Sequence, residues 1–209
     1  MLDLSPKFQQ RVLQDVKDFG IDSVYIPNPI FTEKPLFALI GMESATGGKG
    51  VKEVAKNVNE GFKNFLTSEQ DFILHYCAYT YLCKGQFQYL ITDISKGAML
   101  TKLASKYRHR RYQAWCPLLK EELSAFSRPP IAIAIGIGTR HQLNKLGFPV
   151  EHYVRHYSVR VRVRHTPDRR AAAIGWAWAR RGSGRLFAVR WLAGAGRDAL
   201  LRPLASLGV

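Results

Sequence analysis

The sequence predicts an α/β protein, a three-layer α/β/α sandwich around a four-stranded, mainly parallel sheet. Short runs of consecutive apolar residues, typical of strands buried on both faces of a parallel sheet, alternate with segments whose apolar residues recur every three or four positions. Strands and helices that alternate along the chain favour β–α–β units. The 209 residues suffice for one domain of ordinary size with its own core.

The first part of the chain predicts a helix, an extended connection and a strand. Apolar residues at helical intervals predict the helix over residues 5–19, with Ser5 as its N-cap and Gly20 as its stop. The two prolines of the following segment DSVYIPNPIF leave no room for another helix. The run LFALIG, residues 36–41, is then the first buried strand.

A glycine-rich loop follows this strand and leads to two further helices. Spacings of three and four predict one helix over residues 51–66, and Ser68 and Asp71 are placed to cap the next, EQDFILHYCAYTYLC. After a turn at Gly85, the run FQYLITDIS is the second strand, with Asp93 near its end.

The third and fourth strands complete the predicted sheet. A long basic helix over about residues 102–126 comes first, and its polar surface is expected to carry Arg108, Arg110, Arg111 and Lys120. The segment PPIAIAIGIGTRHQLNKLGF then gives the third strand, a glycine turn and a short helix. VEHYVRHYS, residues 150–158, is the fourth strand.

The formal net charge of +15 indicates a polyanionic partner, most often nucleic acid, but the charge is unevenly placed. Residues 1–150 hold 19 basic and 13 acidic residues, whereas residues 151–209 hold 12 arginines, no lysine and three acids. More than half of the excess charge therefore lies near the C-terminal end, and the smaller excess of the preceding part is the better guide to function.

Residues 160–209 form a tail rich in Arg, Ala and Gly, distinct from the domain predicted over residues 1–159. Two interpretations stay open. The tail is a DNA-binding arm, with arginines for phosphates and Trp176, Trp178 and Trp191 for base stacking. Alternatively, it is translated from a shifted reading frame or a GC-rich fusion, was never selected to fold, and is disordered.

Three cysteines, Cys77, Cys83 and Cys116, fit neither a disulfide framework nor a pair of zinc ligands. We expect reduced thiols, hence a cytoplasmic protein of a bacterium or archaeon, or a nuclear protein, that is not secreted. The N-terminus lacks the apolar core of a signal peptide, and no run of 18 apolar residues occurs. A soluble monomer without a membrane partner is the expectation.

Polar and glycine residues stand where the predicted strands end, and the carboxyl ends of parallel strands meet at one edge of a sheet. Glu43 follows the first strand, Asp93 ends the second, glycines 136 and 138 follow the third and His156 lies in the fourth. A partly desolvated Glu43 has a raised pKa and can orient or deprotonate a water molecule. His156 can donate to a developing anion, or is structural.

The remaining candidates each have two interpretations. Glycines 47, 48 and 50 allow a backbone or a phosphate to approach, or simply form a turn. Asp93 reads a hydrogen-bond donor on a ligand, or caps the next turn through Ser95. Lys96 and the helix arginines taken alone indicate a solvated face.

The order of these motifs resembles that of the uracil-DNA glycosylase superfamily over about residues 24–159. LFALIGMES resembles its first motif, a strand ending in Gly-x-[Asp/Asn/Glu]-Pro or a variant, and YLITDISKGAM its second, Leu-Thr-Asn-x-x-Lys. IAIAIGIGTRHQLNKLGFP is similar to its third strand and helix, and VRHYSVR to its His-Pro-Ser motif.

The resemblance implies a uracil-DNA glycosylase-like fold and the excision of a flipped uracil, or another deaminated or damaged base, from single- or double-stranded DNA in base-excision repair. Glu43 would position the attacking water, His156 would stabilise the leaving base anion, and Asp93 and Met42 would contact the base. The implied contacts to DNA phosphates come from Gly41, Gly47, Gly48, Lys96, Arg140 and Ser158.

The sequence departs from the family pattern at several positions. Ser44 and Tyr157 stand where proline is usual, and Asp93 replaces an amide. An ionised aspartate only accepts hydrogen bonds, so it would suit a base with an exocyclic amino group. No phenylalanine follows Glu43 closely enough to stack on a base unless Phe62 or Phe65 folds back.

No metal and no cofactor is expected, because the four cysteines that hold an iron–sulfur cluster in some branches are missing. Two alternatives to a glycosylase remain. One is a nucleotide-binding or methyl-transfer enzyme with a cradle of glycines 41, 47, 48, 136 and 138. The other is a catalytically inactive module that binds nucleic acid.

Overall fold

The computed structural model describes residues 2–148, 150, 152–154 and 156, together with the backbone of 176–178 and 187–189. Its centre is a five-stranded sheet in the order β1-β3-β2-β4-β5. The strands of this sheet are β1 (Val24–Tyr25), β2 (Phe37–Ala45), β3 (Tyr89–Met99), β4 (Ile131–Ile135) and β5 (His152–Val154). The α/β class expected from the sequence is confirmed.

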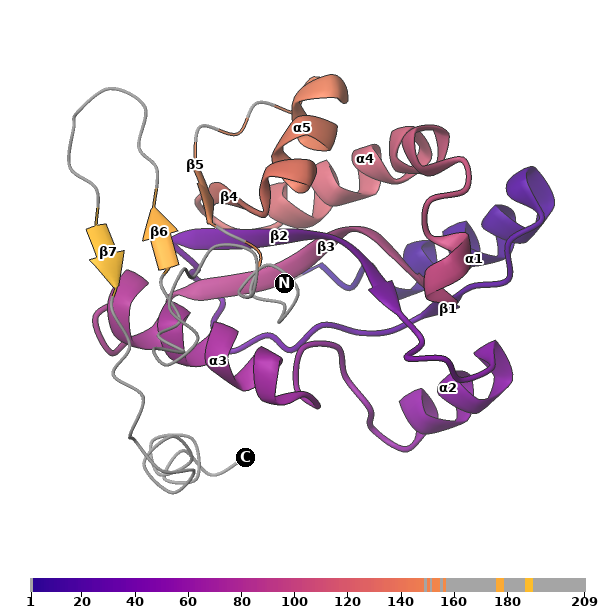
Figure 1. Cartoon of the computed structure of the whole chain (residues 1–209), viewed down its shortest axis with the longest axis horizontal. Helices are drawn as coiled ribbons and strands as arrows, with labels where there is room; N and C mark the ends of the chain where they lie inside the picture. Colours follow the sequence, from indigo (N-terminus) through magenta and orange to yellow (C-terminus); the bar gives the residue numbers. More distant parts are fainter. Residues whose placement is uncertain are drawn as a thin grey trace, which may run out of the picture.

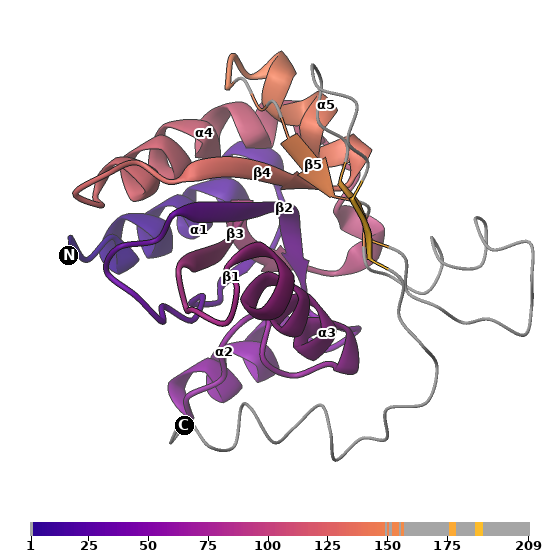
Figure 2. The same cartoon turned by 90° about the vertical axis from the view of Figure 1, so that its left-hand side faces the viewer.

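Helices cover both faces of the sheet (Figure 1). The α-helices are α1 (Ser5–Phe19), α2 (Val51–Asn59), α3 (Glu69–Cys77), α4 (Arg108–Ser124) and α5 (Ile137–Lys145). Two short helical segments are the π-helical η1 (Ala78–Leu82) and the 3₁₀-helical η2 (Thr101–Leu103). Figure 2 shows α4 and α5 on one side of the sheet and α3 on the other.

The sheet is mixed, with one strand more than the four expected. Strands β2, β3, β4 and β5 are mutually parallel, whereas β1 runs antiparallel to β3. The segment with two prolines, expected as a plain connection, contributes β1 through Val24 and Tyr25. β3 is 11 residues long and ends level with β2, where Met99 pairs with Ala45. Gly97 and Ala98 pair with β1 along the opposite edge of β3.

Two separate apolar layers hold the sheet between the helices. On one face, Leu39, Ile91 and Ile133 pack against α3 residues such as Leu74. On the other face, the strand residues in between, such as Ile40, pack with residues of α4 and α5. Both faces of the central strands are therefore buried, as their continuous apolar runs predicted.

Three predicted helices begin or end differently in the structure. The helix expected over 51–66 stops at Asn59, and Gly61 follows with a positive φ of 96°. The helix after Ser68, whose capping box is present, changes from α to π geometry after Cys77. The long basic helix begins only at Arg108, because its N-cap residue has left-handed backbone geometry.

The C-terminal region is described only in part. β6 (Trp176–Trp178) and β7 (Phe187–Val189) pair antiparallel as a separate two-stranded sheet. The rest of residues 160–209 lies outside the described residues, and so do most of the positions on which the two interpretations of the tail depend. Ser158 and Tyr157 also lie outside them.

Candidate active site

The parallel strands bring Gly41, Glu43 and Asp93 to one edge of the sheet. Gly41 on β2 is the register partner of Asp93 on β3, and Glu43 is the partner of Ser95. The chain passes from β2 to β3 through α3 on one face, and from β3 to β4 through α4 on the other. The winding direction therefore reverses between β2 and β4, where open α/β sheets bind ligands beyond the carboxyl ends.

Glu43 lies at the end of β2 with a carboxylate that is only 9% exposed. Its Oε1 accepts a hydrogen bond of 3.0 Å from Nη2 of Arg108, whereas its buried Oε2 has no partner among the described residues. Desolvation raises the pKa of Glu43, and the charges of Arg108 and Arg111 oppose this rise. A carboxylate with one anchored and one open oxygen can accept a hydrogen bond, and then a proton, from water.

Two arginines of the first turn of α4 surround Glu43. Arg108 is half-buried, and Arg111 is completely buried with its Nη2 at 3.4 Å from Ser95 Oγ. Nε and Nη1 of Arg111 have no partner among the described residues. The expectation that Arg111 lies on a solvated helix face is wrong. It precedes the buried Trp115 by one helical turn, and this spacing was the local signal for its burial.

Asp93 is buried within a small hydrogen-bonded group. Its Oδ2 accepts hydrogen bonds of 2.9 Å from Ser44 Oγ and 2.9 Å from Asn64 Nδ2. Desolvation raises the pKa of Asp93 to about 6, although Lys96, Ser44 and Asn64 all favour the charged form. Ser44, the residue after Glu43, thus has a defined role as a donor to Asp93.

Asn64 was not singled out from the sequence, although it links three other polar side chains. Its Nδ2 also lies 2.7 Å from Ser44 Oγ and 3.0 Å from Asn28 Oδ1, so three acceptors, Asp93 included, share its two N–H groups. The loop after α2 returns to β2 and β3 and places Asn64 there, with its backbone N–H on the carbonyl of Pro27. No local pattern around Asn64 signals this contact, because it depends on where the loop folds.

Neither phenylalanine of this loop is available for stacking. Phe65 is 7% exposed and belongs to the core on the α3 side. Phe62 packs against the cluster of Ile26, Val54 and Ala98. Stacking of Phe62 or Phe65 on a base would require this loop to fold back toward the strand ends. The loop does fold back, but the side chain that it brings to Asp93 is the amide of Asn64.

Met42 and His156 approach the turn between β4 and α5. A Cβ atom at Gly138 would lie 2.6 Å from Met42 Cε, and one at Gly136 would lie 3.4 Å from His156 Cβ. His156 is exposed, yet desolvation by the surrounding protein lowers its pKa, which favours the neutral imidazole with one N–H donor. These contacts place both residues at the same edge as Glu43.

The glycines of the predicted phosphate cradle differ in what surrounds them. Gly47 and Gly48 form an exposed turn with φ values of 65° and 88°, and no other atom lies within 4 Å of an added Cβ. Gly41 and Gly138, in contrast, face the side chains of Asp93 and Met42. At Gly41 the hydrogen-bonded carboxylate of Asp93 explains the glycine, whereas at Gly138 the neighbouring atom is the flexible end of Met42, which can move aside.

Lys96 and Arg140 do not join the group around Glu43. Lys96 is buried, so its expected place on a solvated face is wrong. Its Nζ lies 2.8 Å from Glu122 Oε2 and also donates to Thr92 Oγ1 and the carbonyl of Asp93. Arg140, on α5, lies over the ring of Tyr153 with its guanidinium carbon 5.2 Å from the ring centroid.

The part of the chain that the structure describes offers no metal centre. No group of three His, Cys, Asp or Glu side chains there could hold a metal ion. The three cysteines are buried, and none of them is in a disulfide bond. No described helix combines the length and apolar character that a membrane span requires.

No protein-family model matches this chain, and no curated protein matches it either.

Proposed function

We propose that residues 1–159 form a uracil-DNA glycosylase-like domain that hydrolyses the N-glycosidic bond of a flipped base in DNA. The observation that carries the proposal is the Glu43 carboxylate at the carboxyl edge of the parallel strands. It is desolvated, anchored by Arg108, and has one oxygen without a partner among the described residues. Asp93 lies beside it on the neighbouring strand, and His156 reaches the same edge past Gly136.

In this proposal the side chains divide the hydrolysis between them. Glu43 Oε2 accepts a hydrogen bond from water and takes its proton as the oxygen attacks C1′ of the sugar. The C1′–N bond breaks, and its electron pair leaves with the base. His156, whose lowered pKa favours the neutral ring, donates an N–H to the base anion. Asp93 selects a base with an exocyclic amino group, because its ionised form only accepts.

The segment that carries Arg108 also supports DNA as the partner. Residues 101–111 contain no acidic residue. Exposed basic side chains there are Lys102, Lys106, His109 and Arg110. They follow directly on β3 and lead into the two arginines that surround Glu43, so DNA phosphates held by this segment would place a flipped base near the carboxylate.

The test uses single- and double-stranded oligonucleotides that carry uracil, hypoxanthine or oxidised bases. Abasic sites are cleaved with alkali and quantified. Glu43→Gln and His156→Ala are each expected to abolish base release while DNA binding persists. Glu53→Gln makes the same change at an exposed carboxylate on α2 and should release base at the wild-type rate.

Each alternative predicts a different outcome of this test. DNA binding without base release from any substrate would favour the catalytically inactive module. Affinity for nucleotide cofactors without affinity for DNA would favour the nucleotide-binding or methyl-transfer enzyme. Base release that Glu43→Gln leaves unchanged would contradict the role of Glu43 as the base that activates water.

A further inference from the structure

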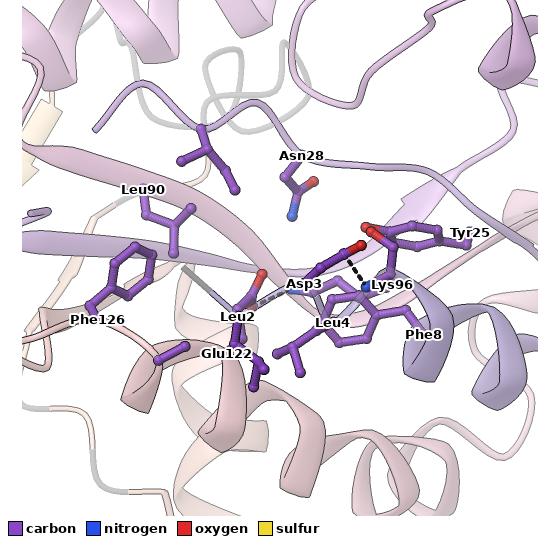
Figure 3. Close-up of a pocket in the computed structure, with 13 residues that line it drawn as sticks. Leu2, Asp3, Leu4, Phe8, Tyr25, Asn28, Leu90, Lys96, Glu122 and Phe126 are labelled. Atoms are coloured by element: carbon purple, nitrogen blue, oxygen red, sulfur yellow. Dashed lines mark hydrogen bonds and ion pairs between the residues drawn. The ribbon is translucent and has the colours of Figure 1, made fainter. Parts of the chain in front are cut away.

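A pocket of about 290 Å³ lies away from Glu43, between the N-terminal segment, β3 and the end of α4 (Figure 3). Its apolar lining comes from Leu2, Leu4, Phe8, Ile30, Leu90, Ala125 and Phe126, and its polar lining from Asp3, Ser5, Tyr25, Asn28, Lys96 and Glu122. In Figure 3, Leu90 and Phe126 lie on one side, and Phe8 and Tyr25 on the other. The volume is at the small end for ligand pockets.

The cation in this pocket has no donor to spare. Lys96 Nζ has three N–H groups, and it contacts three acceptors within the protein: Thr92 Oγ1, the Asp93 carbonyl and Glu122 Oε2. An anionic ligand would therefore have to compete with Glu122 for Lys96. This arrangement disfavours a carboxylate or phosphate as the ligand.

The acceptors, in contrast, are only partly used. The donors Thr92 and Lys96 both reach Oε2 of Glu122, which leaves Oε1 for the pocket. Asp3 is exposed at the mouth of the pocket, where its carboxylate accepts hydrogen bonds from the backbone N–H and the side chain of Ser5. After Lys96 and Glu122 neutralise each other, the pocket keeps the negative charge of Asp3.

Aromatic rings also line the pocket, and the ammonium group of Lys96 already lies 5.6 Å from the centroid of the Phe8 ring. The rings of Phe8 and Tyr25 are 5.4 Å apart between centroids. Both carboxylates act on Tyr25: after desolvation, the charges of Glu122 and Asp3 help to raise its pKa, so its phenol stays neutral. Carboxylates next to aromatic faces attract organic cations, because charge attraction and the ring quadrupole act together.

We infer that this pocket binds a small organic amine, with its ammonium group toward Asp3 and Glu122 and its apolar body against Leu90 and Phe126. The inference is independent of base release, because Glu43, Asp93 and His156 do not line the pocket. The full chain would then have two ligand sites, one for a DNA base and one for an organic amine.

Three probes that share a phenyl ring and differ in head group test the inference: 2-phenylethylamine, 3-phenylpropanoate and 3-phenylpropanol. Calorimetry and thermal unfolding of the full chain are the measurements. The amine is expected to bind with a Kd of about 1 mM or lower and to raise the melting temperature, and the other two probes should bind at least about tenfold more weakly.

A matched pair of variants locates the binding. Asp3→Asn keeps an acceptor for the Ser5 N–H but removes the charge, and should weaken amine binding several-fold. Asp22→Asn makes the same change at an exposed position outside the pocket and should leave the affinity unchanged. Tighter binding of the propanoate, no binding of any probe, or equal amine affinity in both variants would overturn the inference.

Discussion

The carboxylate of Asp93 occupies the space that a side chain at position 41 would need. A Cβ atom added to Gly41 would lie closer to Asp93 Oδ1 than van der Waals contact allows. The two residues are register partners on β2 and β3. A glycine on one strand thus allows a buried carboxylate on the next, and this couples the sequence at position 41 to the candidate site.

Gly41→Ala is therefore expected to displace Asp93 from Ser44 and Asn64 and to lower the free energy of unfolding by about 1–3 kcal/mol. Gly50→Ala is the matched control, because Gly50 has an ordinary φ of −69° and open space around an added Cβ. Urea unfolding of both variants measures the difference. Equal stability of the two would show that Asp93 moves aside without loss.

The pKa of Asp93, raised by burial to about 6, has a consequence for stability against pH. Between pH 4 and 6 the folded protein binds a proton that the unfolded chain has released, so this group lowers the stability as the pH rises. The loss reaches about 3 kcal/mol. Because His75 acts in the opposite direction, the effect is measured as a difference: the stability of Asp93→Asn relative to the wild type should rise from pH 4 to 7, whereas that of the exposed Asp22→Asn should stay constant.

His75 acts in the opposite direction over the same pH range. Burial lowers its pKa to about 4, and its ring lies between Tyr89 Oη and the carbonyl of Phe65. Below pH 6.5 the imidazole of the unfolded chain binds a proton, whereas the buried ring of the folded protein stays neutral. The free energy of unfolding therefore falls by up to about 3 kcal/mol as the pH falls to 4. Relative to the wild type, His75→Gln should gain stability as the pH falls from 6.5 to 4, whereas His109→Gln, at an exposed position, should keep a constant difference. Parallel curves for the two variants would contradict the burial of His75.

Lys96 and Glu122 form an ion pair whose removal should be severe. Lys96→Met leaves Glu122 without its cation beside the pocket and is expected to lower the free energy of unfolding by about 3–5 kcal/mol. Lys56→Met breaks the exposed ion pair with Glu60, whose charged atoms are 3.8 Å apart, and should change the free energy of unfolding by less than about 1 kcal/mol. Thermal or urea unfolding compares the two, and a small effect of Lys96→Met would indicate that the pair contributes little.

In the proposed reaction, Arg108 is expected to set the pH at which Glu43 acts as the base. Removing its charge in Arg108→Gln should raise the pKa of Glu43 further, because Arg108 opposes the effect of desolvation. The acid limb of the base-release profile should then move to higher pH, and a carboxyl NMR titration should show the same direction. Arg110→Gln, on the same helix and exposed, should move neither.

Local patterns in the sequence were sufficient for the central strands and for the edge at which they end. The apolar runs at β2, β3 and β4 are buried on both faces because helices cover both. Since carboxyl ends of parallel strands share one edge, Glu43, Asp93 and His156 could be grouped without knowledge of the structure. The capping box of Ser68 and Asp71 was likewise local, because it joins residues three apart.

Only the tertiary structure decided which polar groups are buried and with whom. Asn64 meets Asp93 across 29 positions of the chain, and Lys96 meets Glu122 on a different element. From the sequence, a lysine or arginine in a polar segment is predicted to be exposed, because the distant carboxylate that neutralises it when buried cannot be identified. The sequence alone therefore determined the fold class and the edge that carries the candidate site, whereas contacts between distant segments decided the charge and pKa values of that site and formed the separate pocket.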